Sequence, residues 1–208
     1  MKLKKIASLM LAGVMAISML AGCSNNGSND NKGEETVETG IVAAVNDALS
    51  KETKEIITFA ADSTVDTQLK AALNAAGEKA TDEQVRAKLA SIIDDSKEVY
   101  AANIANVLNP TLSNDADPQE VTGVAVFKAT DNLTEEASMK NLVDQISTLV
   151  DGHLKANNVT ATTFVGSKAT KYSYDTAAVS MVKVTALDGT TNYYAAVVIT
   201  VTASVYTV

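Results

Sequence analysis

The chain has 208 residues and carries 25 acidic against 17 basic side chains, which gives a net charge of -8 at pH 7. This acidic balance argues against nucleic-acid binding, because contacts to phosphates require clustered lysine and arginine side chains. A single cysteine and a single histidine exclude a disulfide within the chain and leave too few ligands for an ordinary zinc site. The length is sufficient for one substantial hydrophobic core or two small ones.

Residues 1–22 have the order of features that defines a secretory signal peptide. Lys2, Lys4 and Lys5 precede an uncharged apolar run over residues 6–19. That run is too short, and wrongly flanked, for a transmembrane helix. We therefore expect residues 1–22 to be removed during export.

The run Leu20-Ala21-Gly22-Cys23 comes next and resembles the lipobox of bacterial lipoprotein precursors. The resemblance implies cleavage before Cys23 and thioether diacylation of Cys23 with chains such as palmitate. Two acyl chains anchor a protein firmly, whereas one chain alone is marginal. The resemblance thus implies a lipoprotein held in the cell membrane through the lipid on Cys23 and facing the outside of the cytoplasmic membrane. The alternative is an ordinary cleaved signal peptide followed by an incidental cysteine.

Residues 23–36 have the composition of a flexible linker. The stretch over residues 24–35 reads SNNGSNDNKGEE and contains no apolar side chain. Polar sequences rich in glycine, serine and asparagine behave as flexible tethers. We expect residues 23–36 to form a lipidated tether that lifts the folded part away from the bilayer.

Residues 37–110 are rich in alanine, and their apolar residues recur at helical spacing. We expect one helix over residues 37–61, broken near the polar stretch that begins at Ser50. A second apolar stripe covers residues 65–76 and predicts another helix, with Gly77 at the position of a C-terminal cap.

Thr81 and Gln84 match a capping box, which places the start of a third helix just before residue 85. Its apolar stripe continues over residues 85–108, and such a helix would be about 40 Å long at 1.5 Å per residue. Pro110 would end it. Residues 109–118 contain both prolines of the chain and are predicted to form a loop between the helical part and the part that follows.

The next segment predicts a strand followed by a helix. Residues 121–129 are rich in β-branched side chains and indicate a strand. Asp131-Asn132 is a turn signal, and Thr134 is a plausible N-cap. Residues 134–154 form the cleanest amphipathic pattern of the chain, so we expect this helix to pack on a sheet.

The C-terminal segment predicts an antiparallel hairpin. Residues 159–165 and 171–174 look extended and suggest one bent or bulged strand. Residues 177–187 and 190–206 are two apolar runs that flank Asp188-Gly189. An Asp-Gly pair between such runs is the strongest short-range indication of a two-residue hairpin loop.

A two-residue loop also predicts which residues pair. Val184 would lie opposite Tyr193, and Val182 opposite Ala195. The predicted faces follow from this register. One face would hold Val182, Val184, Tyr193, Val197, Ile199 and Val201, and the other Val179, Met181, Lys183, Tyr194 and Val198. Because both faces are fairly apolar, we expect both to be covered.

These elements predict an α+β fold, in which N-terminal helices precede a β-α-β-β-β unit with a mainly antiparallel sheet. By element order alone the last unit is similar to cystatin-like and nuclear-transport-factor-like folds. The helix over residues 134–154 would cover one face of the sheet and the N-terminal helices the other. The helical part (residues 37–110) and the sheet part (residues 119–208) would then pack as one domain.

His153 is the only histidine of the chain, so a serine-histidine-acid triad would depend on it. The nucleophile-elbow pattern of glycines around a serine is absent, as are phosphate-binding and dinucleotide-binding glycine motifs. We therefore interpret His153 as a histidine near the end of a helix, where the carbonyl groups favour it. No catalytic, metal or cofactor-binding residue is predicted.

Carboxylates and tyrosines also suggest no site. Asn114, Asp115 and Asp117 lack the spacing of a calcium loop, so a solvated turn is favoured. The neighbours in Asp94-Asp95 and Glu135-Glu136 do not face each other on a helix and cannot form acid-base pairs by themselves. Five tyrosines of the C-terminal part favour the core or surface of the sheet over a recognition patch: Tyr172, Tyr174, Tyr193, Tyr194 and Tyr206.

The sequence therefore favours a cell-surface or envelope lipoprotein that acts as a non-enzymatic binding or interaction module. Its expected partners are the membrane, through Cys23, and a protein or envelope component. An exposed apolar patch would support this reading. The alternatives are a small-molecule-binding lipoprotein, which requires a closed pocket, and a carboxylate-based envelope hydrolase, which requires a cleft with two carboxylates of shifted pKa.

Overall fold

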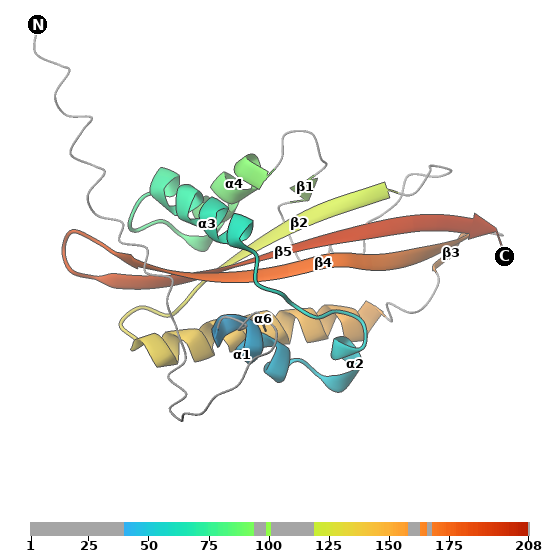
Figure 1. Cartoon of the computed structure of the whole chain (residues 1–208), viewed down its shortest axis with the longest axis horizontal. Helices are drawn as coiled ribbons and strands as arrows, with labels where there is room; N and C mark the ends of the chain where they lie inside the picture. Colours follow the sequence, from blue (N-terminus) through green and yellow to red (C-terminus); the bar gives the residue numbers. More distant parts are fainter. Residues whose placement is uncertain (1–39, 94–98, 101–118, 158–162, 166–167, 208) are drawn as a thin grey trace, which may run out of the picture.

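A five-stranded sheet organises the fold (Figure 1). The computed structural model describes residues 40–93, 99–100, 119–157, 163–165 and 168–207, so the signal peptide, the tether and the loop at residues 109–118 lie outside the described residues. The strands are β1 (Val99–Tyr100), β2 (Gln119–Lys128), β3 (Thr163–Val165), β4 (Lys168–Thr185) and β5 (Thr191–Thr207). Their order in the sheet is β1-β2-β5-β4-β3, with β1 parallel to β2 and all other neighbours antiparallel.

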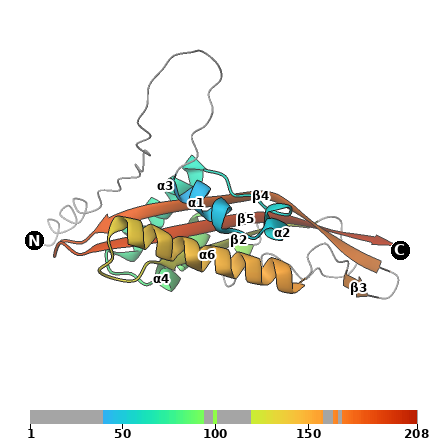
Figure 2. The same ribbon diagram turned by 90° about the horizontal axis from the view of Figure 1, so that it is seen from below.

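Helices cover both faces of this sheet. They are α1 (Gly40–Ala48), α2 (Lys51–Lys54), α3 (Ser63–Ala76), α4 (Asp82–Ile93) and α6 (Glu135–Asn157). In Figures 1 and 2, α3 and α4 lie on one side of the strands, and α6, α1 and α2 lie on the other. The order β2-α6-β3-β4-β5 confirms the predicted α+β fold with its β-α-β-β-β unit.

Each face of the sheet carries its own hydrophobic core. The α6 core contains buried residues of α1, α6 and the sheet, among them Val42, Val45, Leu142, Ile146, Val197 and Ile199. The α3–α4 core lies on the opposite face and includes Leu69, Leu89, Val124, Val126, Val182 and Tyr194. Both cores therefore combine segments that precede residue 94 with segments that follow residue 118.

Local capping signals set several helix ends as the sequence predicts. Ser50 is the N-cap of α2, and its hydroxyl accepts the backbone N–H of Thr53. The Thr81 N–H donates to Gln84 Oε1 at 3.0 Å, and the Gln84 N–H donates to Thr81 Oγ1 at 3.3 Å, which completes the capping box. Gly77 follows α3 with a φ of 100°, a conformation that glycine adopts without steric cost. The break near Ser50, the capping box and the role of Gly77 are confirmed.

The segment after α2 is extended, so the predicted continuation of a helix to residue 61 is wrong. The side-chain amide of Asn46 holds Phe59 through two hydrogen bonds, from Nδ2 to the Phe59 oxygen (2.8 Å) and from the Phe59 nitrogen to Oδ1 (2.9 Å). The Ala60 N–H donates to the Ala177 oxygen at 2.9 Å, which attaches the segment to β4. These contacts bury Phe59 and replace the hydrogen bonds of a helix.

The long helix predicted over residues 85–108 is also wrong. Helix α4 ends at Ile93, and Val99 and Tyr100 form β1, which pairs with Thr122 and Gly123 of β2. Pairing with a strand distant in sequence overrides the local helical spacing, and propensity is only a weak prior in such a case. The rest of the predicted helix lies outside the described residues.

Two predictions about the C-terminal strands need correction. Residues 163–165 and 168–185 do not form one bent strand, because β3 and β4 pair with each other as an antiparallel hairpin. The irregularity lies inside β4, between Tyr174 and Thr176, where the register against β5 shifts. The extra residue, Asp175, thus forms a bulge within the longer strand.

The β4–β5 loop has three residues and not two, which moves the predicted register by one position. The Gly189 N–H donates to the Ala186 oxygen (2.9 Å), the Ala186 N–H donates to the Thr190 oxygen (2.8 Å), and Gly189 has a φ of 85°. This is a turn followed by a left-handed glycine, the usual geometry of three-residue hairpin loops. Val184 consequently pairs with Asn192 and not with Tyr193.

A shift of one residue turns a strand's side chains to the other face of the sheet. Val182 and Val184 therefore lie with Tyr194 and Val198 in the α3–α4 core, whereas Tyr193 lies in the α6 core. Helix α6 covers one face as predicted. The N-terminal helices do not share the other face, because α1 and α2 pack beside α6 while α3 and α4 pack opposite.

Candidate binding groove on helix α6

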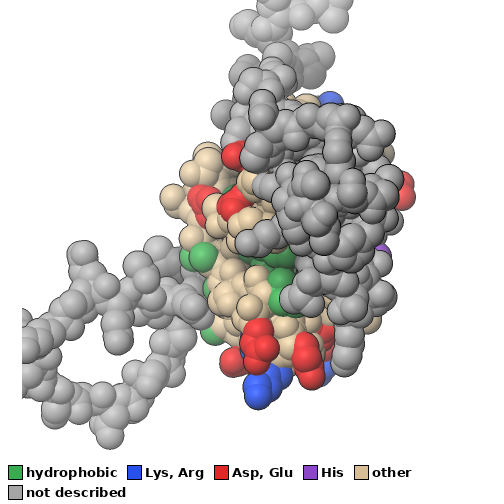
Figure 3. Space-filling model, turned by 90° about the vertical axis from the view of Figure 1, so that its right-hand side faces the viewer, with side chains coloured by type: hydrophobic (Ala, Val, Ile, Leu, Met, Phe, Trp, Pro, Cys, Tyr) green, Lys and Arg blue, Asp and Glu red, His purple; other side chains and the backbone are tan. Residues whose placement is uncertain are grey.

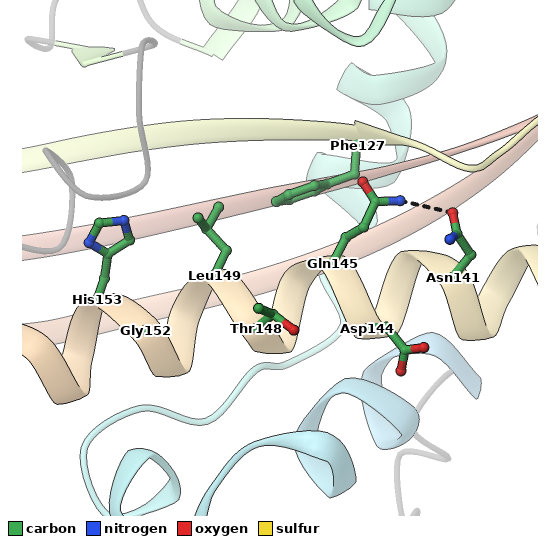
Figure 4. Close-up of a pocket in the computed structure, with 8 residues that line it drawn as sticks. All are labelled: Phe127, Asn141, Asp144, Gln145, Thr148, Leu149, Gly152 and His153. Atoms are coloured by element: carbon green, nitrogen blue, oxygen red, sulfur yellow. Dashed lines mark hydrogen bonds between the residues drawn. The ribbon is translucent and has the colours of Figure 1, made fainter.

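A groove of about 640 Å³ lies between helix α6 and strand β2 (Figure 4). Strand β2 contributes Phe127, and the other lining residues come from α6: Asn141, Asp144, Gln145, Thr148, Leu149, Gly152 and His153. The groove is open to solvent along its length and is not a closed pocket. Phe127 and Leu149 are half-buried and supply its apolar surface.

The spacing of the α6 residues explains how one helix forms a whole wall. Asn141, Gln145, Leu149 and His153 recur every fourth residue, so they lie on one face of the helix. Figure 4 shows the side chains of Gln145, Leu149 and His153 on the side of α6 that faces Phe127, while Asp144 points away. Leu149 belongs to both surfaces, because it lines the groove and also packs against the α6 core.

A hydrogen-bond network fixes the two amide side chains of the groove. The Thr130 N–H donates to Asn141 Oδ1 at 3.1 Å, which identifies this atom as oxygen because a backbone N–H can only donate. Gln145 Nε2 then donates to the same Oδ1 at 2.9 Å and to the Lys128 oxygen at 3.3 Å. Gln145 Oε1 and Asn141 Nδ2 remain as an acceptor and a donor held in fixed positions.

Charges near the groove compensate one another. Lys140 Nζ lies 2.6 Å from the Asp144 carboxylate, and Lys128 Nζ lies 2.9 Å from that of Asp131. The Lys140–Asp144 pair is largely exposed, whereas the Lys128 side chain is only 25% exposed. Surface pairs of this kind are worth little in stability, but they leave the rim close to neutral. On the face seen in Figure 3, acidic side chains are scattered over the described surface among few lysine and arginine side chains.

The groove offers hydrogen bonds and apolar contact more readily than covalent chemistry. Within the described ranges, no hydrogen bond joins His153 to a carboxylate or a nucleophilic hydroxyl. No group of three or more histidine, cysteine, aspartate or glutamate side chains in those ranges is arranged to hold a metal ion. The arrangement suits recognition of a ligand with both polar and apolar groups.

A second polar cluster links the start of α6 to the long hairpin. The Glu135 carboxylate accepts hydrogen bonds from Lys183 Nζ (3.4 Å) and the Tyr193 hydroxyl (3.3 Å). Lys183 Nζ also lies 5.7 Å from the centroid of the Tyr193 ring. The hydrogen bond to Glu135 raises the pKa of Lys183, and burial raises the pKa of Tyr193. Glu136 is exposed, so this cluster attaches the helix and does not form an acid pair.

The tyrosines whose side chains are described belong to the core and its margins, as the sequence predicts. Tyr194 is fully buried, and its hydroxyl donates to the Ala80 oxygen at 2.7 Å. Burial raises the pKa of this hydroxyl to about 12. Tyr193 is buried, while Tyr172 and Tyr174 are half-buried against the α6 core. Burial also raises the pKa of Tyr172 and Tyr174.

The sequence interpretation missed this groove. The sequence predicts His153 only as a residue near the end of a helix, and in the structure it also lines the groove one turn before α6 ends. Leu149 and Phe127 line the groove and also pack against the α6 core. The available indication was the four-residue recurrence of Asn141, Gln145 and His153 beside the core stripe.

Several sequence predictions lie outside the described residues: Cys23, Asp94-Asp95, Asn114, Asp115 and Asp117. Among the described residues, large hydrophobic side chains are exposed only at Ile92 (38%) and Leu187 (87%), so an extended apolar patch is not seen there. None of the described helices combines the length and apolar character needed to cross a bilayer. Comparisons with family models, curated proteins and solved structures give no match to this chain.

Proposed function

We propose that this chain is a lipid-anchored envelope lipoprotein that acts as a non-enzymatic binding module through the α6 groove. The observation that supports binding is the groove itself, where half-buried Phe127 and Leu149 lie beside amide groups of fixed orientation. Apolar surface with a few fixed polar groups is the usual composition of a recognition site.

The two alternatives have weaker support. A small-molecule receptor usually encloses most of its ligand, whereas this groove is open along its length. A carboxylate-based hydrolase needs two acidic groups at one site. Asp144 is the acidic residue of the groove lining, and it is paired with Lys140.

The anchor is tested separately from the groove. Replacing Cys23 with serine removes the sulfur that would carry the acyl chains, so Cys23→Ser should move the protein from the membrane fraction to the soluble fraction. Metabolic labelling with a palmitate analogue should label the parent protein and not the variant. Continued membrane association of an unlabelled Cys23→Ser protein would overturn the anchor.

Photo-cross-linking on intact cells tests the groove. A photoreactive amino acid replaces Thr148, an exposed residue of the groove, or Thr67, an exposed residue of α3 on the opposite side of the sheet. Both are solvent-facing threonines on helices, so they form a matched pair. A binding groove predicts a discrete adduct from position 148 that is absent from position 67. Identical patterns from both positions, or none from either, would contradict a binding role for this groove.

A further inference from the structure

The α6 groove presents one hydrogen-bond acceptor and one donor in fixed positions. Both hydrogens of Gln145 Nε2 are used, in the bonds to Asn141 Oδ1 (2.9 Å) and to the Lys128 oxygen (3.3 Å). Gln145 therefore offers a ligand only its Oε1 atom. Asn141 Oδ1 accepts both Gln145 Nε2 and the Thr130 N–H, so Asn141 offers a ligand its Nδ2 donor. Because these side chains are already ordered, binding to them costs less conformational entropy.

An apolar surface lies next to these two groups. Phe127 and Leu149 line the groove and are half-buried, and Figure 4 shows the Phe127 ring beside Gln145 and Leu149. A ligand that satisfies the groove must therefore combine an apolar face with hydroxyl or amide groups at its margin.

The charges of the groove favour an uncharged ligand. Asp144 is the one carboxylate among the described lining residues, and it points away from the groove and is paired with Lys140 at 2.6 Å. No lysine or arginine is among those lining residues. A phosphate or carboxylate would lose water without meeting a cation, and a cationic ligand would meet no free carboxylate.

Two neutral classes of ligand fit this groove poorly. An extended peptide needs main-chain partners on β2, but Val124 and Val126 as whole residues are only 1% and 6% exposed, so the main chain of β2 beside the groove is covered. An acyl chain would cover Gln145 Oε1 and Asn141 Nδ2 without replacing their hydrogen bonds to water, which is unfavourable.

We propose that the ligand of the α6 groove is an uncharged glycan chain. This inference rests on the proposed function, because it names the ligand class of the same groove. A sugar ring has an apolar face of C–H groups and a margin of hydroxyl groups. The C–H face packs on Phe127, one hydroxyl donates to Gln145 Oε1, and a second oxygen of the glycan accepts a hydrogen bond from Asn141 Nδ2.

The open shape of the groove agrees with a chain of sugars. The lining residues from Asn141 to His153 span about 18 Å of helix at 1.5 Å per residue, which is longer than one sugar ring. A glycan can lie along this length with its outer hydroxyl groups in water, so a closed pocket is not required. We therefore expect oligosaccharides to bind more tightly than the corresponding monosaccharides.

Screening on an array of neutral and acidic glycans tests the proposal, with the full chain in micelles of a detergent that has no sugar headgroup. A family of neutral oligosaccharides should be retained, and its uronic-acid counterparts should not. In solution the retained hexasaccharide should bind about tenfold more tightly than its monosaccharide. It should also change the NMR chemical shifts of the Gln145 side-chain amide and of Leu149 and His153.

Two asparagine variants form a matched pair for this test. Asn141→Asp keeps an oxygen for the Thr130 N–H and removes the Nδ2 donor, so glycan binding should weaken about tenfold. Asn74 is exposed on α3 in the opposite layer, so Asn74→Asp adds the same charge and should leave binding unchanged. Phe127→Leu keeps an apolar side chain but removes the ring, and it should weaken binding about tenfold while circular dichroism shows a folded protein.

Three results would overturn the glycan as the ligand: no neutral glycan bound at millimolar concentration, equal binding of neutral and acidic glycans, or equal effects of Asn141→Asp and Asn74→Asp. A protein adduct from position 148 together with any of these results would leave the binding function standing, with a protein as its partner. A glycan bound only away from the groove, with no adduct from position 148, would overturn both the glycan and the binding function of the groove.

Discussion

The two helical layers cover the same sheet to different extents. Helix α4 packs chiefly on β2, and Val124 and Val126 on that side are almost completely buried. On the other side α6 and α1 are centred over β5 and β4, and Phe127 of β2 stays half-buried. The same strand is therefore sealed on one face, whereas on the other face Ala125 is buried and Phe127 stays partly accessible.

This difference suggests a division of roles between the layers. The α3–α4 layer consists of two short helices that are close in sequence, with a cap at Gly77 and a capping box at Thr81, and it closes its face. The α6 layer relies on one helix of 23 residues with both a core stripe and a groove stripe. Both layers supply a hydrophobic core, and the α6 layer in addition carries the open groove in which we propose that a ligand binds.

The largest effect on stability is expected from a matched pair of leucine truncations, one in each layer. Leu89 is fully buried in the closed layer, so Leu89→Ala should lower the free energy of unfolding by about 2–5 kcal/mol. Leu149 is half-buried in the groove, so Leu149→Ala should cost about 1 kcal/mol or less while weakening ligand binding. Chemical denaturation followed by circular dichroism measures both. Equal losses would mean that the two faces are packed alike.

A smaller effect is expected from the polar contact inside the closed layer. Tyr194→Phe removes the hydroxyl that donates to the Ala80 oxygen and leaves a buried carbonyl without that partner. The expected loss is about 1–2 kcal/mol, read from the denaturation midpoint. Asn192→Ala, which removes a longer contact (3.5 Å) to the Glu78 oxygen, is the comparison and should cost less.

The same hydroxyl gives the closed layer a dependence on high pH. Burial raises the Tyr194 pKa from 10.0 to about 12, so the neutral form is favoured in the folded state. The stabilisation that comes from the neutral, buried Tyr194 hydroxyl is complete below pH 10 and is lost as the pH rises toward 12. The parent protein should therefore lose more stability than Tyr194→Phe over that interval. Parallel curves for the two proteins would show that ionisation of Tyr194 is not linked to unfolding.

The smallest effect is expected where the hairpin tip touches the closed layer. Lys79 pairs with Asp188 at 2.6 Å, and this hydrogen bond holds the Asp188 pKa far below its usual range. Both side chains are exposed, and water and salt screen such pairs. Lys79→Met should leave the Tm unchanged within error at moderate salt. A clear decrease would mean that the tip is held by electrostatics.

Local signals made much of the fold predictable. Gly77 and the Thr81–Gln84 box act through neighbouring backbone groups, so the sequence alone indicates them correctly. It also indicates the break near Ser50, although not the role of Ser50 as an N-cap. The amphipathic pattern of α6 is equally local. The α+β class follows from these elements and from the β-branched runs of β2, β4 and β5.

The features that could not be predicted depend on contacts between segments that are distant in the sequence. Val99 and Tyr100 leave the helical pattern because β2 supplies a strand partner. The left-handed Gly189 adds one residue to the hairpin loop and reverses the faces of Val182 and Val184. The groove forms only because Phe127 of β2 lies close to α6. The residue spacing within each segment does not indicate that the two segments are close.

The position of β5 in the chain has a consequence for the order of synthesis. It is the last strand described, yet it lies at the centre of the sheet and pairs with both β2 and β4. The helices made first have no complete surface to pack on until this strand has left the ribosome, since such distant contacts form late. We therefore expect the nascent chain to remain incompletely folded until β5 has been made, and passage through a narrow translocation channel requires such a state.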